Sequence, residues 1–155
     1  MTKFDTLEEN TDIQALIKTT FDTDLSITGS WGYTQEQASI IHALPEGMTL
    51  PQLEHMLTTI RAHLEMNITL AQENRYGGIN ANERSREVIS ADTLVFDKVT
   101  YEVTGIKEDL FNAFIKEYKE GYGKEDFDLN VHFKRRKAAT LTREVTHYFE
   151  VSAVQ

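Results

Sequence analysis

The sequence contains no cysteine, only two prolines and no hydrophobic run long enough to span a bilayer. Without cysteine, neither a disulfide framework nor a thiolate metal site can form. The N-terminal residues are polar and acidic, and they lack the basic segment and apolar segment that make up a secretory signal peptide. These absences favour a cytoplasmic protein that does not contact a membrane.

Basic residues are also scarce. Lysine and arginine number 16 against 25 aspartate and glutamate residues, and the formal net charge is −9. Residues 1–50 carry eight acidic and two basic residues, a net of −6. Because an acidic chain is repelled by phosphate backbones, nucleic acid is not an expected partner. The exception is the run from Lys134 to Lys137, for which a solvated helix end is favoured over contact with a phosphate or an acidic partner.

What is present suffices for one folded unit. The chain has 155 residues, and 40% of them are hydrophobic, which supports a single core at this length. It shows no internal repeat, no low-complexity tract and no linker, and its two prolines, Pro45 and Pro51, bracket one short break. We therefore predict one domain over residues 1–155.

Helix starts are marked by three threonine-x-x-glutamine capping boxes, at residues 11–14, 34–37 and 49–52. Apolar residues follow each box at helical spacing. Two further helices are indicated by acidic or apolar patterns. The predicted helices cover residues 13–21, 34–44, 49–59, 107–120 and, less regularly, 129–138.

Strands are indicated by strict alternation of apolar and polar residues. The clearest case is residues 60–70, which alternate without error. Strands are also predicted over residues 93–104 and 141–153. An irregular one is predicted over residues 25–33, where Gly29 and Gly32 interrupt the pattern.

This order predicts the fold class. Strands that bury one face only are typical of an antiparallel sheet, so we predict an α+β fold with about four antiparallel strands and helices packed on one face. The order matches the ferredoxin-like βαββαβ plan preceded by an N-terminal helix. A hot-dog-like sheet wrapped around one helix is the alternative.

One candidate ligand site is the long connection predicted over residues 71–90. It contains Gly77-Gly78, which permit a tight turn, and Arg75, Tyr76 and Asn80, which offer hydrogen bonds and a stacking face. A loop of this length is often functional. A plain hairpin connection is the favoured interpretation, and neither a Walker pattern nor GxGxxG is present.

A second candidate is the polar face of the strand predicted over residues 60–70. It would present Arg61, His63 and Glu65, with Glu102 on a neighbouring strand, and these residue types can bind a metal or share a proton. An ordinary solvent-facing surface explains them equally well and is favoured. Trp31, before a predicted helix, would line a pocket or interface or plug the core.

No catalytic motif is found. The five histidines form no HExxH pattern, Ser30 lacks the GxSxG elbow, and no motif ties the chain to a known family. No catalytic residue, metal or cofactor is assigned. His147 lies between apolar residues of a predicted strand, where a hydrogen-bonded core histidine is expected. The RNP1 aromatic pattern of an RRM is absent as well.

The leading functional hypothesis is a non-enzymatic interaction or binding module that forms a homodimer. It depends on the half-exposed sheet and on the aromatic residues of the helix at 107–120. The alternative is a small-molecule-binding protein or enzyme, in which the 71–90 loop closes over the polar sheet face. A third hypothesis is an anion or nucleic-acid contact through the cations at 134–137.

Overall fold

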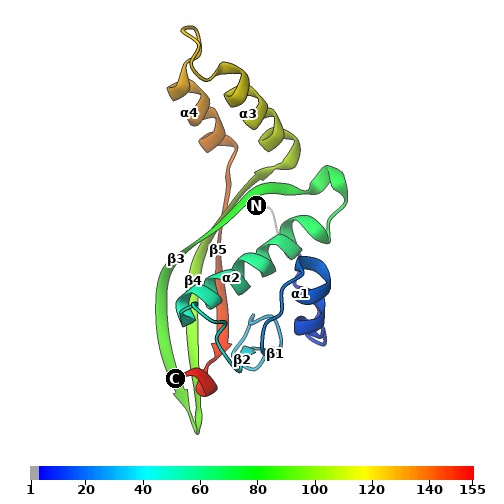
Figure 1. Ribbon diagram of the computed structural model, residues 1–155, viewed down its shortest axis with the longest axis vertical. Helices are drawn as coiled ribbons and strands as arrows, with labels where there is room; N and C mark the ends of the chain where they lie inside the picture. Colours follow the sequence, from blue (N-terminus) through cyan, green and yellow to red (C-terminus); the bar gives the residue numbers. More distant parts are fainter. Residues whose placement is uncertain (1–3) are drawn as a thin grey trace.

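The computed structural model describes residues 4–155, which form four α-helices and one five-stranded sheet (Figure 1). The sheet order is β1-β2-β5-β4-β3, with β2 and β5 parallel and every other neighbouring pair antiparallel. The elements along the chain are α1 (Ile13–Phe21), β1 (Ile27–Gly29), β2 (Ser39–Ile41), α2 (Leu50–His63), β3 (Tyr76–Ala91), β4 (Leu94–Lys107), α3 (Glu108–Gly121), α4 (Leu129–Ala139) and β5 (Leu141–Glu150).

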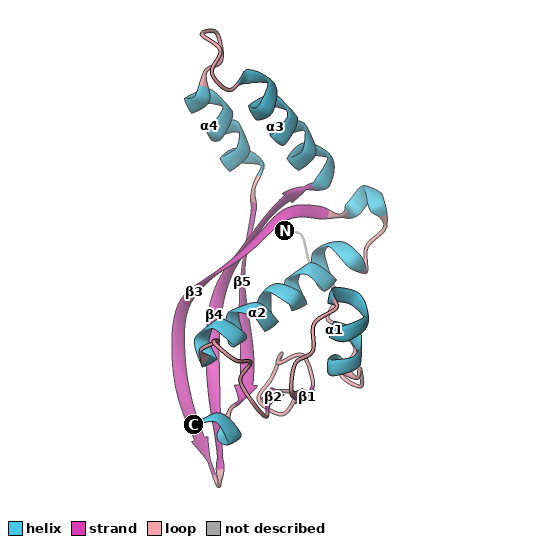
Figure 2. Cartoon of the chain, in the orientation of Figure 1, coloured by secondary structure: helices cyan, strands magenta, loops and turns pink. Residues whose placement is uncertain are grey.

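The helices form two separate groups. Helix α2 crosses one face of the sheet and α1 contacts β1, while α3 and α4 form a helical hairpin that extends beyond one end of the sheet (Figures 1 and 2). Leu53 and Leu57 of α2 belong to one buried cluster with Val99, Tyr101 and Val103 of β4. The intervening residues of β4 are only half-buried, because they point to the opposite, outer face of the sheet.

Most elements with strong local signals are confirmed: α1, the start of α2, α3, α4, β4 and β5. Asp12 is the N-cap of α1 in place of the expected Thr11, and its carboxylate accepts from the Ala15 amide at 3.1 Å. Helix α2 begins with the predicted capping box. Thr49 Oγ1 accepts from the Gln52 amide at 3.3 Å, and Gln52 Oε1 accepts from the Thr49 amide at 2.9 Å.

The prediction of a strand over residues 60–70 is wrong. Residues 60–63 end α2, and Leu64–Ile68 continue it as a π-helical turn. The alternation was misleading because Arg61 and Glu65, which we expected to face solvent, are each only 2% exposed. They lie one helical turn apart, so a buried polar face of a helix resembled the exposed face of a strand.

Three other segments differ from prediction. The helix predicted over 34–44 is a single turn, in which the Gln37 amide donates to Thr34 Oγ1 at 3.2 Å, followed by β2. The predicted 71–90 loop is mostly β3, an edge strand whose many exposed polar residues resembled a loop. Strand β1 covers three residues only, since Gly29 adopts a φ of +82° and ends it.

The α+β class is therefore confirmed, with a five-stranded mixed sheet in place of about four antiparallel strands. The ferredoxin-like order is not clearly reproduced. Two strands precede α2, and β2 joins the sheet through a parallel pairing with β5.

The α3–α4 hairpin is anchored to the sheet at the predicted glycine pair. The Phe111 ring packs on Gly77 and Gly78, where an added Cβ on Gly78 would lie 2.5 Å from Phe111 Cε1. Gly78 has a φ of +57° and lies beside a register shift between β3 and β4. The glycines therefore serve the docking of α3.

Candidate functional site

The α3–α4 hairpin carries a concentration of exposed apolar side chains. Its interior contains Phe114 and His132, whose rings meet edge to face at 5.8 Å. Because an apolar patch of this kind marks an interaction surface, the hairpin is the first candidate site. Its exposed large hydrophobic residues are Leu110, Tyr122, Leu129, Val131 and Phe133, with exposures from 38% to 68%.

The predicted cationic run lies on the same hairpin, in the last turns of α4. Arg135 pairs with Glu117 at 2.9 Å, and the Arg136 guanidinium lies 5.9 Å from the Phe133 ring centre. Within residues 4–155, neither Lys134 nor Lys137 has an ion-pair partner. Phe133, Lys134 and Lys137 lie on one side of the helix, and we call them the α4 ridge.

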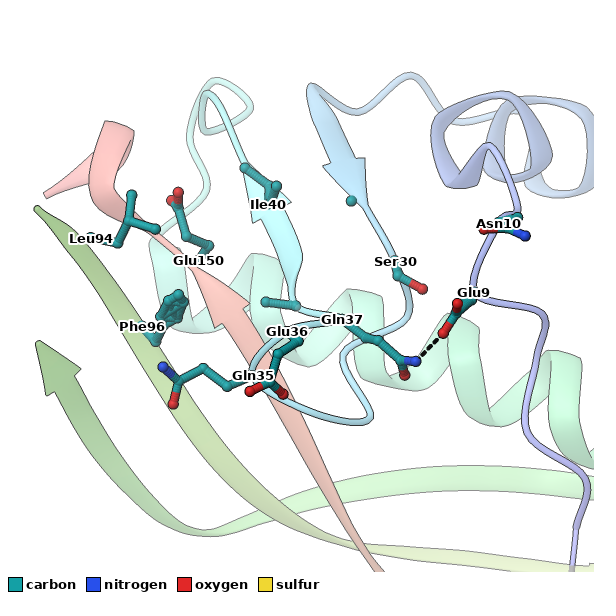
Figure 3. A pocket seen from close by; sticks show the side chains of 12 residues that line it. Glu9, Asn10, Ser30, Gln35, Glu36, Gln37, Ile40, Leu94, Phe96 and Glu150 are labelled. Carbon is teal, nitrogen blue, oxygen red and sulfur yellow. Dashed lines mark hydrogen bonds between the residues drawn. The ribbon is translucent and has the colours of Figure 1, made fainter. Parts of the chain in front are cut away.

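A groove of about 590 Å³ lies on the outer face of the sheet (Figure 3). It is lined by residues of β2, β4 and β5, near the end of the sheet that lies away from the α3–α4 hairpin (Figure 1). Ile40, Glu150 and Phe96 are register neighbours across β2, β5 and β4. Within residues 4–155, none of the carboxylates of this outer-face groove is paired with a cation. Its main apolar side chains are Ile40, Leu94 and Phe96, and its carboxylates are Glu9, Glu36 and Glu150.

A third feature is a row of buried polar residues on the sheet-facing side of α2. Glu54, Thr58, Arg61 and Glu65 are each at most 2% exposed. Their spacing of three to four residues places them on one side of the helix. Buried polar groups require partners, and strands β3, β4 and β5 supply most of them.

Glu54 belongs to a buried carboxylate pair. Arg86 of β3 contacts Glu54 at 3.1 Å and Asp97 at 3.6 Å, so one guanidinium serves two carboxylates. Burial, followed by the hydrogen bond and charge of Asp97, raises the pKa of Glu54 to about 8. Among the described residues, no donor forms a hydrogen bond to the buried Oε2 of Glu54. A protonated Oε2 can donate to Asp97, which accounts for both observations.

His147 is the hydrogen-bonded core residue that the sequence predicts. It is fully buried and shares hydrogen bonds with Thr58 Oγ1 at 3.0 Å and Ser39 Oγ at 2.9 Å. Burial, reinforced by the nearby charge of Arg61, lowers its pKa well below the ordinary value and keeps the ring neutral.

The end of α2 carries a cluster of two guanidiniums, one carboxylate and one phenol. Arg61 donates to the carbonyls of Trp31 at 3.1 Å and Thr146 at 3.0 Å, and its guanidinium lies 4.5 Å from the Tyr33 ring centre. Tyr33 also donates to Glu65, which accepts from Arg143 at 2.9 Å. Burial and the charge of Glu65 raise the pKa of Tyr33, so it remains a donor.

The structure brings three of the predicted site residues together: Arg61, Glu65 and Trp31. They meet inside the fold, where Trp31 is 2% exposed, and not on a polar sheet face. The closure of a 71–90 loop over that face does not occur, because the segment is β3. The other predicted residues are apart: His63 ends α2, Arg75 donates to the Leu70 carbonyl at 2.9 Å, Tyr76 is buried in the core, Asn80 is exposed on β3, and Glu102 pairs with Arg84 at 2.7 Å.

Four residues of these clusters could not be picked out as site candidates from the sequence: Glu54, Asp97, Arg86 and Arg143. A usable signal was present for Glu54, because polar residues at 54, 58, 61 and 65 repeat with helical spacing. For the strand residues no local signal exists, since Arg143 meets Glu65 across 78 residues of sequence.

Residues 4–155 contain no group of three or more His, Asp or Glu side chains placed to hold a metal ion. None of the helices within this range is long and apolar enough to cross a bilayer. No family model matches the chain, and no curated protein or solved structure is significantly similar to it.

Proposed function

We propose that this protein is a non-enzymatic interaction module that self-associates by placing the α4 ridge of one copy in the outer-face groove of another. The observation that carries this proposal is that two surfaces of the same chain, the α4 ridge and the outer-face groove, complement each other in charge and in apolar character. The ridge combines an exposed aromatic ring with lysines that have no carboxylate partner in residues 4–155. The groove combines apolar side chains with carboxylates that have no cation partner in that range.

The position of the two surfaces supports mutual exchange. The hairpin lies at one end of the elongated molecule, and the groove lies near the C-terminal end of β5, at the other (Figures 1 and 3). Two copies arranged antiparallel about a two-fold axis each present a ridge to the other's groove, which gives a closed dimer with two equivalent contacts. A helix lying in a groove is a common mode of recognition between proteins.

The energetics favour such a contact. Phe133 is 46% exposed, and aromatic side chains at the centre of an interface supply much of its binding free energy. The lysines and carboxylates at its edge add specificity and speed association, and salt weakens their attraction. A nucleic-acid partner would meet the same lysines, but the net charge of −9 opposes its approach.

Sedimentation velocity over a hundredfold range of concentration tests the proposal. We expect wild type to self-associate, and we expect two variants to be monomeric: Lys134→Glu/Lys137→Glu, which reverses the ridge, and Glu9→Lys/Glu36→Lys, which reverses the groove. An equal mixture of the two variants restores opposite charges at both contacts and should associate. Lys116→Glu on α3 is the matched control and should behave as wild type.

Two outcomes contradict the proposal. One is a strictly monomeric wild type at the highest concentration. The other is self-association that neither variant reduces. Tight, salt-dependent binding of a DNA duplex by a monomeric wild type, lost in the ridge variant, would assign the lysines to nucleic acid instead.

A further inference from the structure

A cavity of about 380 Å³ lies where the α3–α4 hairpin meets the sheet. This volume is within the range of known small-molecule sites. The sheet contributes residues of β3 and β4 to its walls, and the hairpin contributes Phe111 of α3 and Arg136 of α4. A molecule bound in this cavity would therefore touch both the sheet and the hairpin.

A β-bulge shapes the sheet side of this cavity. Two residues of β3, Gly78 and Ile79, lie opposite the single residue Gly105 of β4, at the register shift that follows Gly77. Bulges interrupt the ladder between strands and are frequent beside functional sites. Because Gly78 and Gly105 have no side chains, they line the cavity with backbone only, which leaves room beside the Phe111 ring.

The charge of this cavity is positive. Among the described residues that line it, Arg136 is the only one with a charged side chain, and it is half-buried. Within residues 4–155, its guanidinium has no ion-pair partner. It also donates no hydrogen bond to another group in that range. The local charge therefore favours an anionic ligand, although the whole chain is acidic.

Two neutral donors line the same cavity. Asn80 of β3 and Thr104 of β4 are direct register partners, so their side chains lie on one face of the sheet. Asn80 Nδ2 donates to the Gly78 carbonyl at 3.3 Å, which uses one of its two N–H bonds. The Thr104 hydroxyl has no partner within residues 4–155. The unused polar groups are thus mainly donors, as an anion requires.

We infer that this cavity binds a small monocarboxylate with a compact apolar body. The planar guanidinium of Arg136 matches the two oxygens of a carboxylate, and Asn80 and Thr104 can donate to the remaining lone pairs. One guanidinium compensates one negative charge, so a phosphate dianion would be left partly uncompensated. Ile106 and Phe111 supply apolar walls for the body of the ligand.

Titration of isotope-labelled protein, followed by the NMR shifts of its backbone amides, tests this inference. The probe is benzoate, and the matched probe is benzyl alcohol, which has nearly the same shape and no charge. We expect benzoate to cause saturable shifts at Gly78, Asn80 and Gly105. Benzyl alcohol should bind at least roughly tenfold more weakly, because it cannot form the charged hydrogen bonds to Arg136. Inorganic phosphate should also bind more weakly than benzoate.

Three variants locate the site. Arg136→Gln removes the cation and should weaken benzoate binding at least roughly tenfold, while Thr104→Val removes one hydroxyl donor and should weaken it about threefold. Lys119→Gln makes the same change of charge on an exposed position of α3, away from the cavity, and should bind as wild type. Amide shifts far from the cavity report whether each variant keeps the native fold.

Three outcomes would overturn the inference: equal binding of benzoate and benzyl alcohol, unchanged binding by Arg136→Gln, or shifts confined to other surfaces. Phosphate that binds more tightly than benzoate and depends on Arg136 would overturn the assignment to a carboxylate. The inference does not rest on the proposed self-association. Glu9→Lys/Glu36→Lys, which reverses the outer-face groove, should therefore bind benzoate with the same shifted amides as wild type.

Discussion

The buried carboxyl of Glu54 makes the stability of this fold depend on pH in an unusual direction. Its pKa is about 8 in the folded protein, against an ordinary value of 4.5, because it is buried beside Asp97 with one shared guanidinium, Arg86. Below pH 4.5 the carboxyl is protonated in both states. As pH rises from there, only the unfolded chain loses the proton, so stability falls until the folded group also ionises near pH 8.

The size of this effect follows from the two pKa values. Each tenfold change in proton affinity is worth about 1.4 kcal/mol, so the full difference amounts to roughly 5 kcal/mol between pH 4.5 and 8. His147 acts in the opposite sense below its ordinary pKa of 6.5, because the folded protein keeps it neutral while the unfolded chain protonates it. Between pH 6.5 and 8 the Glu54 contribution stands alone and amounts to about 2 kcal/mol.

The variant that tests this effect is Glu54→Gln. Its side chain cannot ionise, but its oxygen can still accept from Arg86 and its amide N–H can donate to Asp97. Urea unfolding, followed by circular dichroism and Trp31 fluorescence, gives the free energy of unfolding at each pH. We expect the stability of Glu54→Gln relative to wild type to grow by about 2 kcal/mol between pH 6.5 and 8. Glu102→Gln, at a partly exposed ion pair, should show no such growth. A relative stability of Glu54→Gln that does not change with pH would refute the reasoning.

Two further predictions concern the buried residues His147 and Glu65 and the residues that contact them. Gly32 has a φ of +81°, and an added Cβ would lie 2.1 Å from His147 Cδ2, so Gly32→Ala should cost about 2–4 kcal/mol in urea unfolding. Gly47→Ala, with a φ of +79° and open space around it, is the control; an equal cost at both positions would contradict the close approach. Arg143→Met removes the one guanidinium that hydrogen-bonds to the buried Glu65 carboxylate. It should cost about 1–3 kcal/mol, because Arg61 still lies near that carboxylate. The double variant Arg143→Met/Glu65→Leu should regain most of the lost free energy of unfolding. If the losses from the two single substitutions simply add in the double variant, the two side chains are not coupled and the prediction is contradicted.

The elements that could be predicted are those whose signals are local. The Thr49 capping box defines the start of α2, and alternation along β4 and β5 records the single core face of these strands. The turn between β3 and β4 offered a further signal that the sequence analysis did not use. Asp92 adopts a left-handed φ of +56° there, in a tight connection between two long strands.

What could not be predicted depends on contacts between distant residues. Arg61 and Glu65 look like solvent-facing residues until Arg143 and Tyr33, which come from other parts of the chain, are placed beside them. Arg61 and Glu65 could therefore be named as site candidates from the sequence, but they were assigned to the wrong element and the wrong face. Trp31 is buried, in agreement with one of its two interpretations, a residue that plugs the core. Strand β3 was missed because its exposure on both sides removes the alternation that identifies a half-buried strand.

Zero-length carbodiimide cross-linking between isotope-labelled and unlabelled copies tests the proposed self-association most directly, because it joins only a lysine and a carboxylate already in contact. We predict mixed-isotope cross-links, identified by mass spectrometry, between Lys134 or Lys137 of one copy and Glu9, Glu36 or Glu150 of the other. Cross-links confined to single copies, or mixed-isotope links that join other surfaces and spare these residues, would contradict the account.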